Sequence, residues 1–196
     1  MELAETLRLR RMVRNYTDQP VPVDSVERIV DAGRRAPSAG FSQGQAFVIV
    51  TDADRRRRIA TAAGEDDYVA SGFHRWVSEA PVQVVLLVSE EAYHRRYTEP
   101  DKTVDGAEIE WPVPYWWVDA GASLMAMLLA SVDEGLAAGF LGAHAIDELR
   151  AIVEAPAEFQ AVGIVTIGHP APDRRSASLR RGWRDRASVV HHERWT

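Results

Sequence analysis

VQVVLLVS, residues 82–89, is the stretch of sequence that indicates the fold most directly. Valine and leucine fill all but two of its positions, and a short run of this kind predicts a strand buried on both faces. Two further apolar runs, at 46–52 and 161–170, predict neighbouring strands, and the glycine-spaced segment 137–144 predicts a strand that enters a loop. We therefore expect a central sheet.

Helical segments alternate with these strands. One begins near Asp24, where Glu27 resembles the second half of a capping box, and ends before Pro37. The next has Asp52 or Asp54 as its N-cap. This alternation predicts an α+β fold in which helices flank a mixed central sheet. The expected helices are 3–11, 24–36, 52–64, 67–77, 115–134 and 146–154.

The chain has the size and composition of one globular domain, residues 1–196, with 46% hydrophobic and 27% charged residues. It contains no cysteine, which excludes a disulfide framework, a thiolate nucleophile and a cysteine-ligated metal site. The early arginines are interleaved with acids and leucines, so we expect no signal peptide and a cytoplasmic protein. Asp119 and Gly121 interrupt the apolar stretch 115–132, which favours a buried core helix over a membrane span.

Basic residues gather at both ends of a chain whose formal net charge is −6. RLRRMVRNY (8–16) and DRRSASLRRGWRDR (173–186) hold the clusters, whereas the long loop 98–114 is acidic. One phosphate gripped from both ends would explain the pattern, and two independent solvated faces explain it equally well. The acidic net charge and the lack of a reading helix disfavour nucleic-acid binding. The tail 171–196 cannot bury itself, so we expect it to wrap a partner subunit.

GFSQG (40–44) matches the G-x-S-x-G elbow of hydrolases, which would make Ser42 a nucleophile with Asp147 and His169 as partners. The elbow needs a strand before it and a helix after it, and here the order is inverted. The pentapeptide is better interpreted as a loop whose small residues let backbone approach a ligand. The six histidines lack metal-ligand spacing, so we expect no metal site, and neither a P-loop nor a Rossmann fingerprint is present.

Two segments near the start of the chain match a known pattern. In LRLRRMVRNY, Arg10, Arg14 and Tyr16 match, and Met12 stands where a serine is usual. In this respect the chain resembles the nitroreductase family of FMN flavoproteins, whose opening segment uses basic residues to hold the FMN phosphate. RAPSAGFSQGQAF (35–47) resembles the family's flavin-lining loop. Its matches are Pro37, Ser38, Gln43 and Phe47, while Phe41, Gly44 and Gln45 replace asparagine, proline and tryptophan.

Two later segments complete the resemblance. Residues 119–142 are similar to the family's long central helix and the glycine-rich segment that follows it. Residues 167–195 are similar to its closing strand and basic tail. The resemblance implies an α+β homodimer with FMN at each subunit interface, built by both chains, with the long helix at the interface and tails that embrace the partner.

The resemblance also implies a function. NAD(P)H would reduce the flavin and leave, and a small nitroaromatic, quinone or other conjugated acceptor would then take electrons at the same face. Flavin N5 carries this chemistry, so no side chain is expected to be catalytic. A flavin or F420 binding protein, and family members that destroy flavin or dehalogenate, stay open as alternatives, and a Ser42 hydrolase is the weakest one. The acidic loop disfavours strongly anionic substrates if it closes over the pocket.

The resemblance assigns the site residues as follows. Arg10 and Arg14 grip the phosphate, Arg11 and Met12 lie in the same cofactor-binding segment, and tail arginines contribute. Backbone amides around Leu141 and Gly142 would meet the ring. The tail arginines are Arg181 and Arg184; the loop residues expected to line the flavin are Pro37, Ser38, Ala39, Ser42 and Gln43; the expected substrate wall is Phe41, Trp111, Tyr115 and Trp116, with Trp117 in the core.

Overall fold

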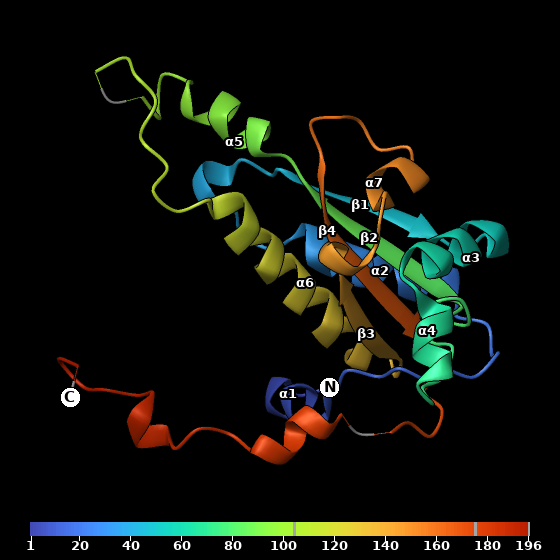
Figure 1. The fold of residues 1–196 in the computed structure, drawn as a ribbon. Helices are drawn as coiled ribbons and strands as arrows, with labels where there is room; N and C mark the ends of the chain where they lie inside the picture. The colour runs from blue at the N-terminus through green and yellow to red at the C-terminus, as the bar shows by residue number, and fades with distance from the viewer. Residues whose placement is uncertain (104, 175, 196) are drawn as a thin grey trace.

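The computed structural model describes residues 1–103, 105–174 and 176–195. In this part of the chain a four-stranded sheet lies at the centre, in the order β1-β2-β4-β3 (Figure 1). β1 and β3 are therefore its two edges. The strands are β1 Gln45–Val50, β2 Val82–Val88, β3 Ala137–Gly142 and β4 Gln160–Gly168, close to the expected ranges.

The α+β class is confirmed, but the sheet is not mixed as expected, because all three strand pairs are antiparallel. The chain leaves β1 and enters β2 at the same end of the sheet, since Val50 lies opposite Gln83. A parallel neighbour would instead need a connection that crosses to the other end. Among the described residues, parallel pairing outside the strands occurs at the isolated bridge between Met12 and Ala138.

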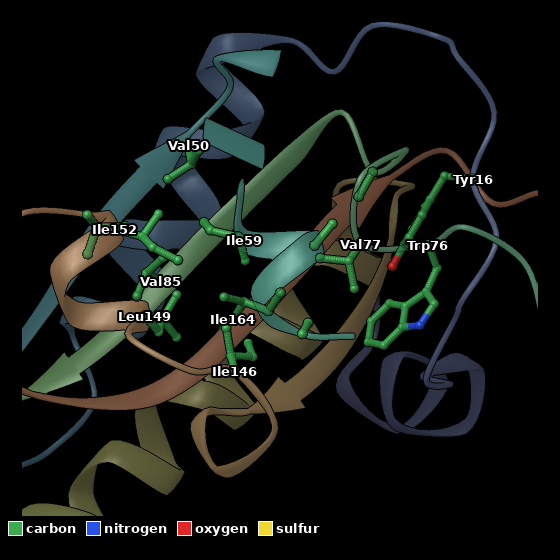
Figure 2. Packing of buried hydrophobic residues seen from close by; sticks show 14 of the residues in the cluster. Tyr16, Val50, Ile59, Trp76, Val77, Val85, Ile146, Leu149, Ile152 and Ile164 are labelled. Carbon is green, nitrogen blue, oxygen red and sulfur yellow. The ribbon is translucent and has the colours of Figure 1, made fainter. Parts of the chain in front are cut away.

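Helices cover both faces of the sheet, and each face has its own apolar cluster. On one face Val85 of β2 belongs to a cluster with Ile59 and Leu149, drawn in Figure 2. On the other face Leu86 belongs to a cluster with Met127. Successive strand residues point to opposite faces, so the fully buried β2 serves both clusters. The first face is covered by α3 Ala53–Ala62 and α7 Leu149–Ile152, and the second by α2 Val23–Arg34 and α6 Tyr115–Asp133.

Helix boundaries differ from expectation where caps or glycines decide them. The expected capping box at Asp24 is wrong, because α2 starts after Pro22 with no side-chain cap. Asp52 does cap α3, accepting a hydrogen bond from the Arg55 backbone at 2.8 Å. The expected helix 67–77 is instead α4, Glu65–Ala70, which ends before Gly72 adopts φ +83°. The first helix, α1, is Leu3–Leu9.

One helix is absent from our sequence-based expectations. α5 spans Glu90–Tyr97, with Ser89 as its N-cap accepting from the Ala92 backbone at 3.2 Å. It is mostly charged and buries Tyr93, so its apolar periodicity is weak. The expected long loop follows it.

Two features leave apolar surface uncovered. The tail runs away from the body past α1 (Figure 1), and Trp183 and Trp195 are 99% and 82% exposed. α6 exposes Trp117, Val118 and Met125 as well. By length and composition alone α6 could cross a membrane, and core helices of soluble proteins meet the same criterion. Only a third of the most apolar 18-residue stretch of α6 is buried in this chain. α6 is therefore less buried than the expected core helix.

Candidate functional site

The basic segment after α1 lies along the edge strand β3. Met12 bridges to Ala138, and the Val13 amide donates to the Ala138 carbonyl at 3.0 Å. Two residues after Arg14, the buried Tyr16 hydroxyl donates to the Val13 carbonyl at 2.9 Å and lies 2.8 Å from the Thr166 hydroxyl of β4. Burial raises the pKa of Tyr16, which therefore stays a neutral donor. The backbone that carries the arginines is thus fixed to the sheet.

The guanidinium groups of three arginines in this segment form no ion pair in the described part of the chain. Within the described residues no carboxylate forms an ion pair with Arg10, Arg11 or Arg14, whereas Arg8 pairs with Glu5 at 3.8 Å. Guanidinium groups left without a carboxylate suit a phosphate, which they can bind in a bidentate manner. The segment therefore fits the phosphate of the expected cofactor.

The start of the tail pairs with this segment. The Arg14 amide donates to the Asp173 carboxylate at 2.7 Å, and Asn15 donates to the Pro172 carbonyl at 2.7 Å. The start of the second basic region is thereby brought to the same edge of the molecule as the first. A pocket of about 300 Å³ opens here, lined by Arg14, Tyr68, Gly72, Phe73, His74, Trp76, Asp173, Arg174, Ser176 and Ala177.

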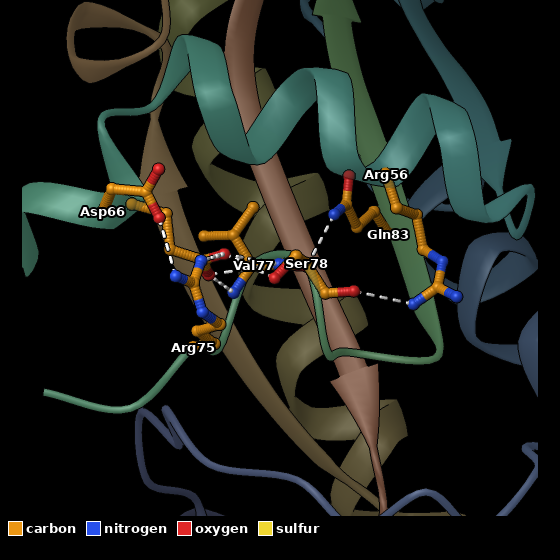
Figure 3. A network of polar contacts seen from close by, with 7 residues as sticks. Arg56, Asp66, Arg75, Val77, Ser78 and Gln83 are labelled. Atoms are coloured by element: carbon orange, nitrogen blue, oxygen red, sulfur yellow. Dashed lines mark hydrogen bonds and ion pairs between the residues drawn. The ribbon is translucent and has the colours of Figure 1, made fainter. Parts of the chain in front are cut away.

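The irregular backbone directly after Trp76, which lines this pocket, is fixed by a polar network (Figure 3). The carboxylate of Glu65, 3% exposed, accepts from the Val77 amide at 2.6 Å, from the Ser78 amide at 3.1 Å and from the Ser78 hydroxyl. Gln83 of β2 donates to the Val77 carbonyl at 2.7 Å, and Arg56 of α3 donates to the Ser78 carbonyl at 2.9 Å. These bonds replace the ladder that a strand or helix would supply.

A second predicted region, the loop 37–43, has an unusual backbone. Gly40, Phe41 and Gln43 have φ values of +60°, +58° and +50°. Phenylalanine and glutamine rarely adopt this left-handed region, and such residues concentrate at ligand sites held by their surroundings. Phe41 is also 72% exposed. The loop therefore presents a strained, outward-facing surface.

Three side chains hold this loop. Asp119 of α6 accepts from the Ala39 amide at 2.8 Å and from the Tyr93 hydroxyl at 2.7 Å. Arg96 of α5 donates to the Gly40 carbonyl at 2.9 Å, and the Ser38 hydroxyl accepts from the Gln43 amide at 2.9 Å. Burial, with Asp119 beside it, raises the pKa of Tyr93, so this hydroxyl also stays a donor.

The Ser42 hydrolase alternative is wrong. The Ser42 hydroxyl donates to the Ala39 carbonyl at 2.6 Å, and Ser42 itself has an ordinary φ of −67° rather than an elbow conformation. His169 lies beyond the opposite end of β4, where its carbonyl accepts from Thr17. The Ser42 hydroxyl therefore does not meet His169, and the triad of Ser42, Asp147 and His169 does not form in the described part of the chain.

Aromatic rings pack beside the loop. Tyr97 lies against Gly40, where an added Cβ would come within 2.6 Å of its ring, and Trp111 contacts Tyr97 with centroids 4.6 Å apart. We expected Trp116 in the substrate wall and Trp117 in the core. The structure shows the reverse, because Trp116 is 6% exposed and Trp117 is 39% exposed. A helix turns about 100° per residue, so neighbours face different directions. Trp116 belongs to the core, and the half-exposed Tyr115 stays at the surface beside Trp111.

Trp111 also anchors the acidic loop. Its indole donates to Glu108 at 2.6 Å, and the same carboxylate contacts the His94 ring at 2.6 Å. The Glu108 hydrogen bond, with a further contribution from Glu90, raises the pKa of His94. Donation from Trp111 and from His94 lowers the pKa of Glu108. The loop is thus bound to α5 by a charged hydrogen bond.

Leu141 and Gly142 end β3 on the same edge as the basic segment. They pair with Ile164 and Gly163 of β4. Because β3 is an edge strand, alternate amides point away from β4 and can donate to a ligand. The predicted half-site made of these amides and the arginines therefore follows the β3 edge, with the arginines beside its start and the amides at its end.

The two halves lie apart within one chain. Met12 bridges to the start of β3, while Gly44 precedes β1, at the other edge and the other end of the sheet. Three strand spacings across and about six residues along give a separation on the order of 20 Å. Figure 1 shows the same arrangement, with α1 at the opposite side of the molecule from α5. Arg181 and Arg184 lie in the projecting tail.

Sequence reasoning missed several residues that shape the site. Asp119 and Arg96 hold the loop, and Trp76 and Phe73 line the pocket. An aspartate inside the apolar run 115–132 was a usable signal, since a buried carboxylate needs donors. The burial of Trp76 had none, because it depends on distant segments.

Comparisons with known proteins agree with this geometry. The Nitroreductase family model matches residues 7–169. The chain is 27% identical over 176 residues to FMN reductase [NAD(P)H] from Bacillus subtilis (strain 168), covering 87% of this chain and 66% of that protein. It is 29% identical over 172 residues to NADPH-flavin oxidoreductase from Vibrio harveyi, covering 85% and 65%. The chain thus spans slightly less than two thirds of the length of these relatives.

Solved structures share the fold. The structure of B. megaterium NfrA2 superposes with a TM-score of 0.76 at 20% identity, covering 100% of this chain and 76% of that one. A putative NADH dehydrogenase/NAD(P)H nitroreductase from Parabacteroides distasonis superposes with a TM-score of 0.70 at 20% identity and 98% coverage of both chains.

Proposed function

Because the chain belongs to the nitroreductase family, we propose that it is an FMN-dependent oxidoreductase that passes electrons from NAD(P)H to a small conjugated acceptor. Relatives named FMN reductase and NADPH-flavin oxidoreductase support the cofactor and the donor. We expect it to act in the cytoplasm.

The observation that carries the proposal is the separation of the two half-sites. The arginines, which form no ion pair within the described residues, lie at one corner of the molecule beside the start of β3, and the strained loop 37–43 lies at the opposite corner. The free edge of β3 runs from the arginines toward the end of the sheet that carries the loop. In a two-fold dimer, the corner with the arginines in one chain could meet the corner with the loop in the other chain. The symmetry would repeat this contact, so the dimer would have two such sites. The exposed apolar residues of α6 and of the tail supply surface for such a dimer. We therefore assign FMN to two sites, each shared by both chains.

The residues on each half have separate tasks. Arg10 and Arg14 would hold the phosphate, and amides near Leu141 and Gly142 would orient the ring system by donating to it. Ser38 and Gln43 of the partner's loop region would contact the ribityl chain or ring. When bound, FMN supplies the electron-transfer chemistry itself. The protein supplies position and shields the site from water.

The acceptor would lie against exposed aromatic rings. Phe41 and Tyr115 are 72% and 44% exposed beside the loop, and Trp111 lies behind Tyr115 with centroids 6.3 Å apart. Flat conjugated molecules such as nitroaromatics and quinones stack well on such rings. We propose acceptors of this class.

Purification of the full chain tests the proposal. The protein should be yellow and should release FMN on denaturation, and anaerobic NADPH or NADH should bleach the flavin absorbance until a quinone or nitroaromatic restores it. Colourless protein that cannot be reconstituted with FMN would overturn the proposal. Bound flavin that neither nicotinamide reduces would instead identify a flavin-binding protein without turnover.

A further inference from the structure

We propose that Trp76 is a positioning residue that holds the guanidinium group of Arg14 in place for the phosphate of FMN. This inference rests on the proposed function, since it assumes that FMN binds beside Arg14. Trp76 itself is not expected to contact the phosphate; it acts through Arg14.

The burial of Trp76 is the first observation. Its side chain is 3% exposed although it lies in irregular backbone between α4 and β2, at one end of the apolar cluster near Tyr16 (Figure 2). The next two residues, Val77 and Ser78, are fixed by the buried carboxylate of Glu65. Because the backbone next to Trp76 is fixed, the Trp76 ring can serve as a rigid support for a neighbouring side chain.

The contacts of the ring are the second observation. A Cβ added at Gly139 of β3 would come within 3.1 Å of the Trp76 ring and 2.4 Å of the Val13 carbonyl oxygen. The ring and the basic segment therefore both lie directly against β3 at this glycine. The guanidinium carbon of Arg14 then lies 5.5 Å from the ring centroid.

The charge of Arg14 is the third observation. The carboxylate of Asp173 accepts from the backbone amide of Arg14 rather than from its guanidinium group. Arginine has many rotamers and loses that freedom when it binds a ligand. A tryptophan face within about 6 Å attracts the cation and restricts it before the ligand arrives. The N–H groups at the edge of the guanidinium stay available for phosphate.

The experiment compares FMN with riboflavin, which lacks the phosphate, binding to the apoprotein by fluorescence quenching. Trp76→Leu should raise the Kd for FMN about ten-fold, the size expected for a buried cation–π contact. It should leave the Kd for riboflavin unchanged, and Trp76→Phe, which keeps an aromatic face, should recover most of the FMN affinity. In an Arg14→Ala background the substitution of Trp76 should have no further effect on FMN.

Val77→Ala is the matched control. It loosens the same segment by truncating a neighbouring buried side chain, so it should lower the melting temperature and leave the ratio of the two flavin Kd values unchanged. The inference is overturned if Trp76→Leu weakens FMN and riboflavin equally, or if its effect on FMN persists with Arg14→Ala. If Trp76→Leu does not fold, Trp76→Met, which keeps a large apolar side chain but no aromatic face, decides by the same cycle. Wild-type protein that binds no flavin would refute the proposed function itself.

Discussion

Arg14 and Arg8 lie six residues apart in one basic segment but have different surroundings. The guanidinium group of Arg14 has no carboxylate partner within the described residues, whereas Arg8 pairs with Glu5 and its side chain is 71% exposed. Arg14→Ala should raise the Kd for FMN ten- to one-hundred-fold, since a charged hydrogen bond contributes about 1.5–3 kcal/mol. Arg8→Ala should change it little. Equal effects in a fluorescence titration would show that the segment is an ordinary solvated face.

Asp119 supports a second prediction about a single residue. Asp119→Ala leaves the Ala39 amide and the Tyr93 hydroxyl without their acceptor in a buried place. It should lower the free energy of unfolding by about 3 kcal/mol, measured by urea denaturation, because unsatisfied buried donors are expensive. Both bonds end on the same carboxylate oxygen, so Asp119→Asn can keep both and should lose less than Asp119→Ala, because a neutral acceptor forms weaker hydrogen bonds than a charged one. Tyr93→Phe is the control, and a loss as large as that of Asp119→Ala would contradict the assignment.

Individual site residues could be predicted only where a local pattern carries them. Arg14 and Ser38 stand in recognisable segments. Arg14 lines the pocket of about 300 Å³, Ser38 accepts from the Gln43 amide in the strained loop, and the contact of both with a cofactor stays a prediction. Trp76 could not be predicted, because its burial depends on Glu65 and Gly139, which are distant in sequence. The prediction that Trp117 rather than Trp116 lies in the core was wrong, since an apolar helix without clear polar positions does not reveal its buried face.

At the scale of elements, the contact between α5 and the acidic loop predicts a pH dependence. The His94 ring faces Glu108, Glu90 and the indole rings of Trp111 and Trp116. Its pKa is raised above 6.5, mainly by Glu108, so protonated His94 binds the loop. A raised pKa stabilises the folded contact fully below the unfolded value, and the contribution is lost as pH rises through the folded value. Glu108 stays ionised across this range because its own pKa is lowered.

The single lysine of the chain allows a direct measurement. Lys102 lies in this loop, so a lysine-specific protease cuts the chain at one site. Cleavage of the wild type should be slower than that of His94→Gln near pH 6, and the two rates should converge as pH rises above the His94 pKa. Comparing the two proteins at each pH cancels the pH dependence of the protease. A ratio that does not vary with pH would show that His94 does not hold the loop.

Elements were predicted well where one strong signal decides them. The runs of valine, isoleucine and leucine in β2 and β4 fix strands, because both faces of these strands are buried. α5 was missed because its charged sequence buries mainly Tyr93, although Ser89 and two following glutamates formed a usable start signal. α4 ended early because backbone conformation at Gly72, not apolar periodicity, decides its end.

At the scale of the whole molecule, sequence could indicate that two chains build the site only through the family resemblance. Nothing local shows that the segment at 10–16 and the loop at 37–43 lie at opposite corners of the sheet. That follows from the strand order β1-β2-β4-β3, which depends on non-local pairing. The shared site is therefore a prediction about assembly and needs a test that distinguishes one chain from two.

Complementation between two defective variants provides that test. Arg14→Ala damages the phosphate half, and Gly40→Val damages the loop half, because a side chain there meets Tyr97 within 2.6 Å at a φ of +60°. Each homodimer should bind little FMN. In a mixed dimer one site combines both defects and the other has none, so random mixing should restore about a quarter of the sites in a two-fold assembly. FMN retained after co-expression, relative to the wild type, measures this fraction. If one chain held a complete site, every site would carry one defect and mixing would restore nothing.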